Sequence, residues 1–306
     1  MTAMKIAVAR ALGMLVALTL AFGCKKKDDA PAVGGSPGAA ATGTAAAAPR
    51  APGAMPFDFA SGPTTAKAGD YVLVPSKNWI DDAFTKGGDK QTFIYYAAKM
   101  VEPGPLESKV KSLSGTEFSA PNGFIVPLRS GQRARPGDVV LTWWQTGSGM
   151  QRSIVVGGSA DEPKALYLDM DYDNPSGSAK KEDALKRDSF HVLGGVLEPG
   201  VSVACKDGAA YKHWIVTAVA PTKLLVIGWA GSMRAFPRAS CTPIPPSAKL
   251  AAGRDVAVPY IGSFYKGKVD RVDARVGRAF VKFTWGGKEK TEAFGIQNVA
   301  APLPGL

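Results

Sequence analysis

Apolar and polar residues alternate in short runs along the last part of the chain, residues 253–299. One predicted strand places Tyr265 and Val269 on one face and lysines on the other. A second alternating run leads into Gly286-Gly287, a dipeptide suited to a two-residue hairpin turn. No run is long enough for an ordinary helix. The pattern therefore predicts one complete, small, five-stranded β-barrel.

Three earlier stretches repeat this pattern. Each copy opens with a glycine that is followed three residues later by valine, at Gly69, Gly137, Gly200 and Gly253. Each copy closes with a segment that begins with phenylalanine, at Phe124, Phe190, Phe236 and Phe294. We therefore expect an all-β chain with four tandem repeats, at residues 67–130, 135–196, 198–246 and 250–302.

The last repeat resembles a Tudor/agenet-type SH3-like barrel. The motifs that carry the resemblance are Gly253-x-x-Val256, Phe264-Tyr265-x-Gly267-x-Val269, Phe280-Val281-x-Phe283 and the Gly-Gly hairpin. The resemblance is good for the last repeat, fair for the third and loose for the first two. It implies tandem SH3-like barrels that bind peptides, modified side chains, nucleic acid or cell-wall material and that rarely catalyse a reaction. The fold alone does not choose among these ligands.

The N-terminus predicts export. Residues 1–23 contain a basic start and the apolar stretch Ala11–Phe22, which at 12 residues is too short to span a bilayer. Gly23 before Cys24 resembles a bacterial lipoprotein signal, which implies lipidation of Cys24, palmitate included, and a membrane anchor. Ala21 stands where that family usually carries leucine, so an ordinary signal peptidase site and a secreted product remain an alternative.

Residues 24–66 are rich in alanine, glycine and proline and almost free of aromatic and branched side chains. Such a segment cannot bury enough surface to offset its ordering entropy, so we expect a disordered linker. Lys25 and Lys26 after the lipidated cysteine resemble lipoproteins sent to the outer membrane. The expected location is therefore the cell envelope, at the outer membrane, with a periplasmic or secreted protein as the alternative.

The repeat alignment makes a specific prediction for two cysteines. Cys205 aligns with Val258 in the first strand of a barrel, and Cys241 aligns with Val299 in the last strand. The first and last strands of a closed five-stranded barrel are neighbours, and an exported chain meets an oxidising compartment. We therefore predict a Cys205–Cys241 disulfide, with two buried free thiols as the alternative.

Candidate catalytic and metal-binding residues are few. The chain has only two histidines, and the possible nucleophile pair Cys205 and His213 uses a cysteine that we expect to be bonded. Asp169, Asp171 and Asp173 alternate as in a calcium loop, but the glycine and glutamate of such a loop are missing. Their alignment places Asp169 and Asp171 on a solvated strand face. We expect no catalytic residue, no metal site and no cofactor.

Aromatic residues at strand ends and loops are the candidate ligand-binding residues, because ring faces attract cations and stack on flat groups. They are Tyr260, Phe264, Tyr265, Trp285, Trp143 and Trp144. Packing of the barrel core is the alternative role for these side chains. Residues 200–246 have five basic residues against one acidic residue and residues 253–302 have nine against five, within a chain of net charge +11.

Together these features predict a non-enzymatic, lipid-anchored binding or scaffold protein of the cell envelope. Its partner would be a protein, a peptide or an anionic polymer, and we do not expect nucleic acid. The alternatives are a purely structural envelope component and an accessory subunit of a cell-wall hydrolase.

Overall fold

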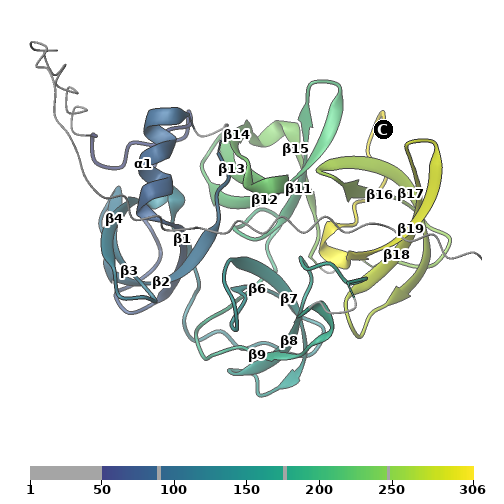
Figure 1. Ribbon diagram of the computed structural model, residues 1–306, viewed down its shortest axis with the longest axis horizontal. Coiled ribbons are helices and arrows are strands. Elements are labelled where there is room, and N and C mark those ends of the chain that lie inside the picture. Colours follow the sequence, from purple (N-terminus) through teal and green to yellow (C-terminus); the bar gives the residue numbers. More distant parts are fainter. Residues whose placement is uncertain (1–49, 88–90, 175–177, 247–248) are drawn as a thin grey trace, which may run out of the picture. The chain divides into compact units, whose positions relative to one another are not determined.

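The computed structural model describes residues 50–87, 91–174, 178–246 and 249–306. The described chain is all-β, as predicted, with one α-helix and several short 3-10 turns (Figure 1). No helix in these ranges is long and apolar enough to cross a membrane. The export signal, Cys24 and the linker up to residue 49 lie outside the described residues.

Within the described residues, nineteen strands form antiparallel sheets that follow the order of the repeats. The first sheet contains β1 (Tyr71–Pro75), β2 (Tyr95–Glu102), β3 (Glu107–Ser112), β4 (Glu117–Pro121) and β5 (Val126–Pro127). The second contains β6 (Val139–Trp143), β7 (Met150–Gly158), β8 (Pro163–Tyr167), β9 (Asp183–Ala184) and β10 (His191–Val192). The third and fourth repeats share one sheet, with β11 (Ser202–Asp207), β12 (Ala210–Val219), β13 (Lys223–Gly228), β14 (Met233–Pro237), β15 (Cys241–Ile244), β16 (Asp255–Tyr260), β17 (Ser263–Asp273), β18 (Arg278–Trp285) and β19 (Lys288–Gly295).

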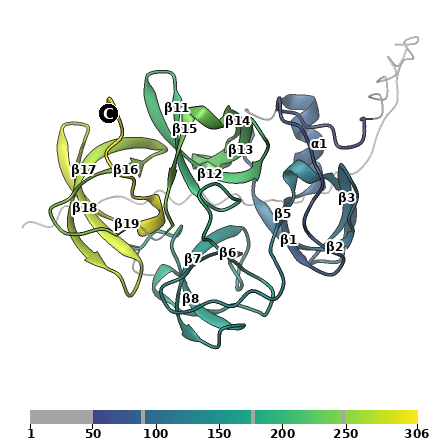
Figure 2. The ribbon, with the colours of Figure 1, turned by 180° about the vertical axis from the view of Figure 1, so that it is seen from behind.

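All four repeats have the same topology. Four strands follow one another as a meander, and the chain then returns to lie beside the first strand. The returning segments pair as Leu73 with Val126, Leu141 with His191, Cys205 with Cys241, and Ala257 with Ala300. Figure 2 shows β5 beside β1 and β15 beside β11. This shared pairing is the spatial counterpart of the sequence repeat.

A register shift recurs at one place in each repeat, in the pairing between the second and third strands. It falls at Met100/Glu102, Val155/Gly157, Val216/Ala218 and Val269/Arg271. A β-bulge bends its strand and increases the local twist, which lets a small sheet curl over its own core. Short 3-10 turns precede the returning segment in the first, third and fourth repeats, at η2 (Asn122–Phe124), η5 (Arg238–Ser240) and η6 (Ile296–Asn298). Two further 3-10 turns are η3 (Ser178–Lys180) and η4 (Trp229–Gly231).

The helix α1 (Lys77–Lys86) joins β1 to β2, and the sequence analysis did not predict it. Ser76 is its N-cap and accepts a hydrogen bond from the backbone N–H of Trp79. Ile80 and Ala83, three residues apart, are buried on the same side of the helix. The N-cap and this helical spacing are local signals of a helix, and they do not appear in a pattern of alternating strand residues.

The linker prediction is wrong for its last part, residues 50–66. Phe57 packs against Phe93 and Phe124, with ring centroids 6.2 and 6.3 Å apart. Phe59 is buried as well, and the Asp58 carboxylate pairs with the Lys223 ammonium of the third repeat. Phe57 and Phe59, together with Met55, supply the apolar surface that holds this segment against the repeats.

Candidate functional site

A pocket of about 460 Å³ lies between the first and second repeats. One wall comes from the end of β1, the start of α1, β2 and the turn between β3 and β4. The other wall comes from the end of β6 and from the loop that joins β6 to β7. The pocket therefore exists only because two repeats pack side by side.

The wall of this pocket is aromatic and aliphatic. Tyr96, Phe118 and Trp143 line it, together with Leu113, whose side chain in the β3–β4 turn is 55% exposed. Trp143 packs on Tyr71 with ring centroids 5.1 Å apart, which fixes its ring at the end of β6. A concave, mostly apolar surface with a few polar groups is the usual form of a small-molecule site.

The charged groups around this pocket are all basic. Lys77 and Lys186 line it, and no carboxylate is among its lining residues. The Lys77 ammonium pairs with Asp81 one helical turn away. Within the described ranges the Lys186 ammonium makes no ion pair and no hydrogen bond. The pocket therefore suits a ligand that combines an apolar body with an anionic group.

The two predicted aromatic residues of the second repeat, Trp143 and Trp144, lie in different surroundings. Trp143 is a pocket residue, as described above. Trp144 folds over its own loop instead, and a Cβ added at Gly147 would lie 2.2 Å from its ring. Gly147 is thus the residue that makes room for the indole of Trp144.

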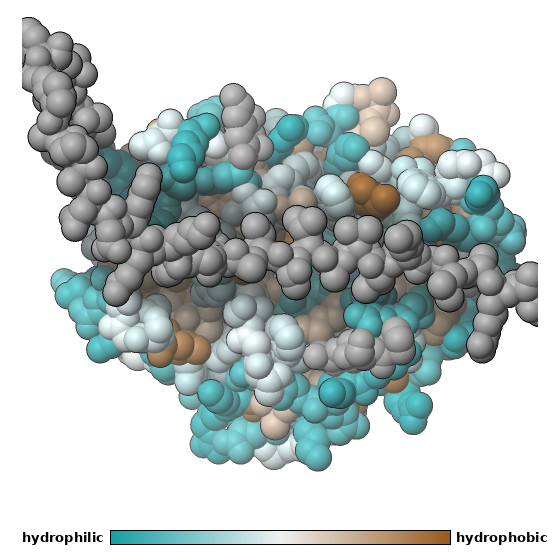
Figure 3. Space-filling view, viewed as in Figure 1, coloured by the Kyte–Doolittle hydropathy of each residue, from teal (hydrophilic) through white to brown (hydrophobic). Residues whose placement is uncertain are grey.

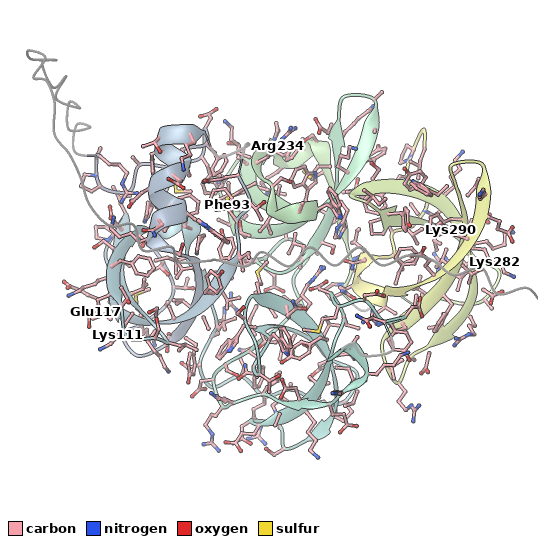
Figure 4. The ribbon with its side chains drawn as sticks, viewed as in Figure 1. Phe93, Lys111, Glu117, Arg234, Lys282 and Lys290 are labelled. Carbon is pink, nitrogen blue, oxygen red and sulfur yellow. A yellow bond between two sulfur atoms is a disulfide. The ribbon has the colours of Figure 1, made fainter. Side chains whose placement is uncertain are left out.

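The predicted aromatic mouth of the fourth repeat is occupied by a side chain of the same repeat. Tyr260 and Trp285 lie with ring centroids 5.3 Å apart, and the Lys290 ammonium lies 4.7 Å from the first centroid and 5.1 Å from the second. Lys290 also donates to the Tyr260 hydroxyl at 2.8 Å, and this hydrogen bond raises the pKa of Lys290. Figure 4 shows Lys290 on the fourth repeat. The place between the rings that would attract a foreign cation is already filled.

The other two predicted mouth residues lie in different surroundings. Phe264 is 4% exposed and packs against His213, between the third and fourth repeats, so it is a core residue. It faces away from Tyr265 because successive side chains of a strand point to opposite faces. Tyr265 packs on Phe283 with ring centroids 6.2 Å apart. Neither lies in the pocket of the first two repeats.

A buried polar network joins the second, third and fourth repeats. Its centre is Arg152, which is 1% exposed and binds the Asp169 carboxylate, the Ser202 hydroxyl and the Asn298 side-chain oxygen. Ser202 also lies 3.0 Å from the His213 ring nitrogen Nε2. A buried ion pair needs such additional hydrogen bonds to offset the desolvation of its charges.

This network corrects the expectation of a solvated face at Asp169. Strand β8 ends at Tyr167, so Asp169 lies beyond the strand and turns inward to Arg152. Burial opposes the charge, but the Arg152 guanidinium holds the pKa of Asp169 below its usual range. Asp171 and Asp173 are exposed. Within the described ranges, no group of three or more histidine, cysteine or acidic residues could hold a metal ion.

The network also influences the protonation state of the His213 ring. Removal from water, together with the nearby Arg152 charge, lowers the pKa of His213 to about 3. The ring is therefore neutral at physiological pH and serves as a hydrogen-bonding partner of Ser202.

The predicted Cys205–Cys241 disulfide is confirmed. The two cysteines face each other across the paired strands β11 and β15, with Cα atoms 4.0 Å apart. Cys205 is completely buried, and His213 contacts Ser202 instead of a thiol. The disulfide closes the core of the third repeat.

In comparisons with known proteins, no protein-family model and no curated protein matches the chain.

Proposed function

We propose that this chain is a non-enzymatic binding protein of the bacterial cell envelope. In this proposal, residues 1–23 direct export, Cys24 carries the lipid anchor, and four SH3-like repeats form the folded part that carries the ligand site. The ligand site is the pocket between the first and second repeats, and its ligand has an apolar body and an anionic group.

The single observation that carries the proposal is the chemistry of this pocket. Three aromatic residues and Leu113 supply apolar surface, while Lys186 supplies a positive charge without a partner among the described residues. No carboxylate lines the pocket, so an anion entering it meets no like charge. Enclosed apolar surface favours a ligand that brings apolar area out of water, at roughly 25 cal/mol per Å².

The aromatic mouth of the fourth repeat is a less suitable ligand site than the pocket of the first two repeats. A cationic ligand there would have to displace Lys290 from Tyr260 and Trp285. The pocket of the first two repeats needs no displacement, because its volume is empty of protein atoms. It is therefore the better binding site in the unliganded protein.

Two fluorescent probes of similar shape test the proposal. The anionic probe is 8-anilinonaphthalene-1-sulfonate, and the neutral probe is N-phenyl-1-naphthylamine, which lacks only the sulfonate. We expect saturable binding of one anionic probe per chain and weaker binding of the neutral probe. Leu113→Asp places a carboxylate in the pocket and should weaken binding of the anionic probe at least ten-fold.

Matched variants distinguish the pocket from general surface binding. Leu106 is also an exposed leucine of the first repeat but does not line the pocket, so Leu106→Asp should leave the affinity unchanged. Lys186→Glu should weaken binding of the anionic probe. Lys181→Glu, which changes an exposed lysine outside the pocket, should leave that binding unchanged. Equal affinities in all four variants would exclude this pocket and favour a purely structural envelope component.

The envelope part of the proposal has its own test. Globomycin blocks the peptidase that processes lipoprotein precursors, so treated cells should accumulate an unprocessed form of this chain. Normal processing in the presence of globomycin would remove the lipid anchor at Cys24 from the proposal.

A further inference from the structure

A second, smaller hollow of about 180 Å³ lies between the third and fourth repeats. Its third-repeat wall contains Lys212, Trp214 and Trp229, and its fourth-repeat wall contains Ile261 and Gly262. A hollow of this size can admit side chains of a partner segment.

Two large apolar side chains at this hollow are exposed to solvent. Trp229 is 64% exposed and Ile261 is 49% exposed. Both lie at tight turns, because Ala230 and Ile261 adopt left-handed backbone conformations with φ values of 56° and 47°. A β-branched residue such as isoleucine rarely takes this conformation, and local strain of this kind collects at functional sites.

Gly262 brings the two repeats together here. A Cβ added at Gly262 would lie 2.9 Å from the Cβ of Trp229, so only glycine allows this approach. Trp229 and the turn that carries Ile261 therefore form one continuous apolar edge. An exposed tryptophan at the rim of a hollow is the kind of residue that dominates binding energy in protein interfaces.

The charge beside this edge is positive. Lys212 is half-buried, and its ammonium donates to the Ser263 hydroxyl at 2.7 Å without a carboxylate partner in the described chain. Arg234 also lines the hollow and pairs with Asp207 at 3.0 Å. Figure 4 shows Arg234 on the third repeat. The neutral His213 ring completes the wall, so the lining carries one net positive charge.

We infer that this hollow is a second binding site, which takes a protein segment with an acidic side chain next to an apolar one. The carboxylate would lie at the Lys212 ammonium, and the apolar side chain would lie between Trp229 and Ile261.

Charge over a wider area favours the same partner. Residues 200–246 carry five basic residues and one acidic residue, and residues 253–302 carry nine and five. Each of these two stretches thus has an excess of four positive charges, which would attract an acidic segment before contact. Figure 3 shows that hydrophilic residues dominate the visible face, with hydrophobic residues in small separate patches. A small apolar edge among basic residues fits a short acidic segment better than a broad hydrophobic partner.

Three peptides test the inference by calorimetry with the full chain. They are acetyl-Asp-Leu-Asp-amide, its asparagine counterpart and its lysine counterpart. All three keep the leucine; the asparagine peptide removes the negative charge at nearly the same shape, and the lysine peptide reverses the sign of the charge. We expect binding of the acidic peptide alone, with an affinity that falls as salt concentration rises. Lys212→Met keeps most of the apolar stem and should weaken binding at least ten-fold, as should Trp229→Ala.

Control variants sit on neighbouring surfaces of the same repeats. Lys206→Met removes an exposed lysine that does not line the hollow, and Trp285→Ala removes the exposed tryptophan of the fourth repeat. Both should bind the acidic peptide within two-fold of the wild type. Equal binding of the acidic and asparagine peptides would overturn the inference, as would an affinity unchanged by Lys212→Met and Trp229→Ala. The pocket of the first two repeats is untouched by these changes, so this result is independent of the anionic-probe test.

Discussion

The neutral state of the half-buried His213 ring makes a quantitative prediction about acid stability. Its ring is neutral in the folded protein because the pKa is lowered from 6.5 to about 3. In the unfolded chain the ring regains its ordinary pKa and is protonated at pH 5. The stability that comes from the neutral ring is therefore present in full above pH 6.5 and is lost as the pH falls toward the folded value.

The size of the effect follows from the two pKa values. Each pH unit between them costs about 1.36 kcal/mol of unfolding free energy, because one more proton is bound by the unfolded chain. Lowering the pH from 8 to 5 crosses about 1.5 units of this interval, which corresponds to about 2 kcal/mol. A His213→Gln variant keeps a hydrogen-bonding side chain near Ser202 but cannot take up a proton.

Urea unfolding at several pH values separates this contribution from the rest. Both proteins lose stability in acid as their carboxylates titrate, and the common part cancels in the difference between them. The wild type should lose about 2 kcal/mol more than His213→Gln between pH 8 and pH 5. Equal losses would show that the ring is protonated without cost, and the description of a neutral, half-buried His213 would be wrong.

Three other changes should alter stability, as measured by urea unfolding. Replacing Cys205 and Cys241 by alanine opens a loop of 36 residues and should cost about 4 kcal/mol, whereas an unchanged stability would contradict the loop-entropy argument. Arg152→Met leaves a buried carboxylate without its partner and should cost about 3–5 kcal/mol, against little change for the exposed Arg187→Met. Gly147→Ala should cost about 1–3 kcal/mol through its clash with the neighbouring indole, and a neutral result would show that the loop adapts.

Local spacing in the sequence was enough to predict the repeated architecture. The glycine that opens each repeat and the phenylalanine that closes it lie at the ends of the meander, so counting residues between them aligned the strands. The same alignment placed Cys205 opposite Cys241 and thereby predicted the disulfide. These successes share a cause, because strand register depends on side-chain alternation within a few residues.

Features that depend on contacts between repeats could not be predicted from local spacing in the sequence. Asp169 was assigned to a solvated face because the alignment continued the strand past Tyr167, where β8 ends. Its partner Arg152 is close only once the second repeat is folded, and the remaining partners come from two other repeats. Phe264 was similarly assigned to a mouth, although the packing of the third repeat on the fourth buries it.

The pocket itself was predicted only through one residue. Trp143 was a candidate ligand-binding residue because of its place at a strand end, and it does line the pocket. The opposite wall comes from β2 and the β3–β4 turn of another repeat, and from α1, which the strand pattern did not reveal. The sequence pattern also did not predict that Lys290 lies against Tyr260 and Trp285, because this contact depends on which side chains meet across β18 and β19.

The most direct test of the account is the position of a bound anionic probe. A crystal structure of the chain with 8-anilinonaphthalene-1-sulfonate should show the naphthalene rings against Trp143 and Phe118, with the sulfonate toward Lys186. A probe bound only elsewhere on the chain would contradict the claim that the first and second repeats together form the ligand site.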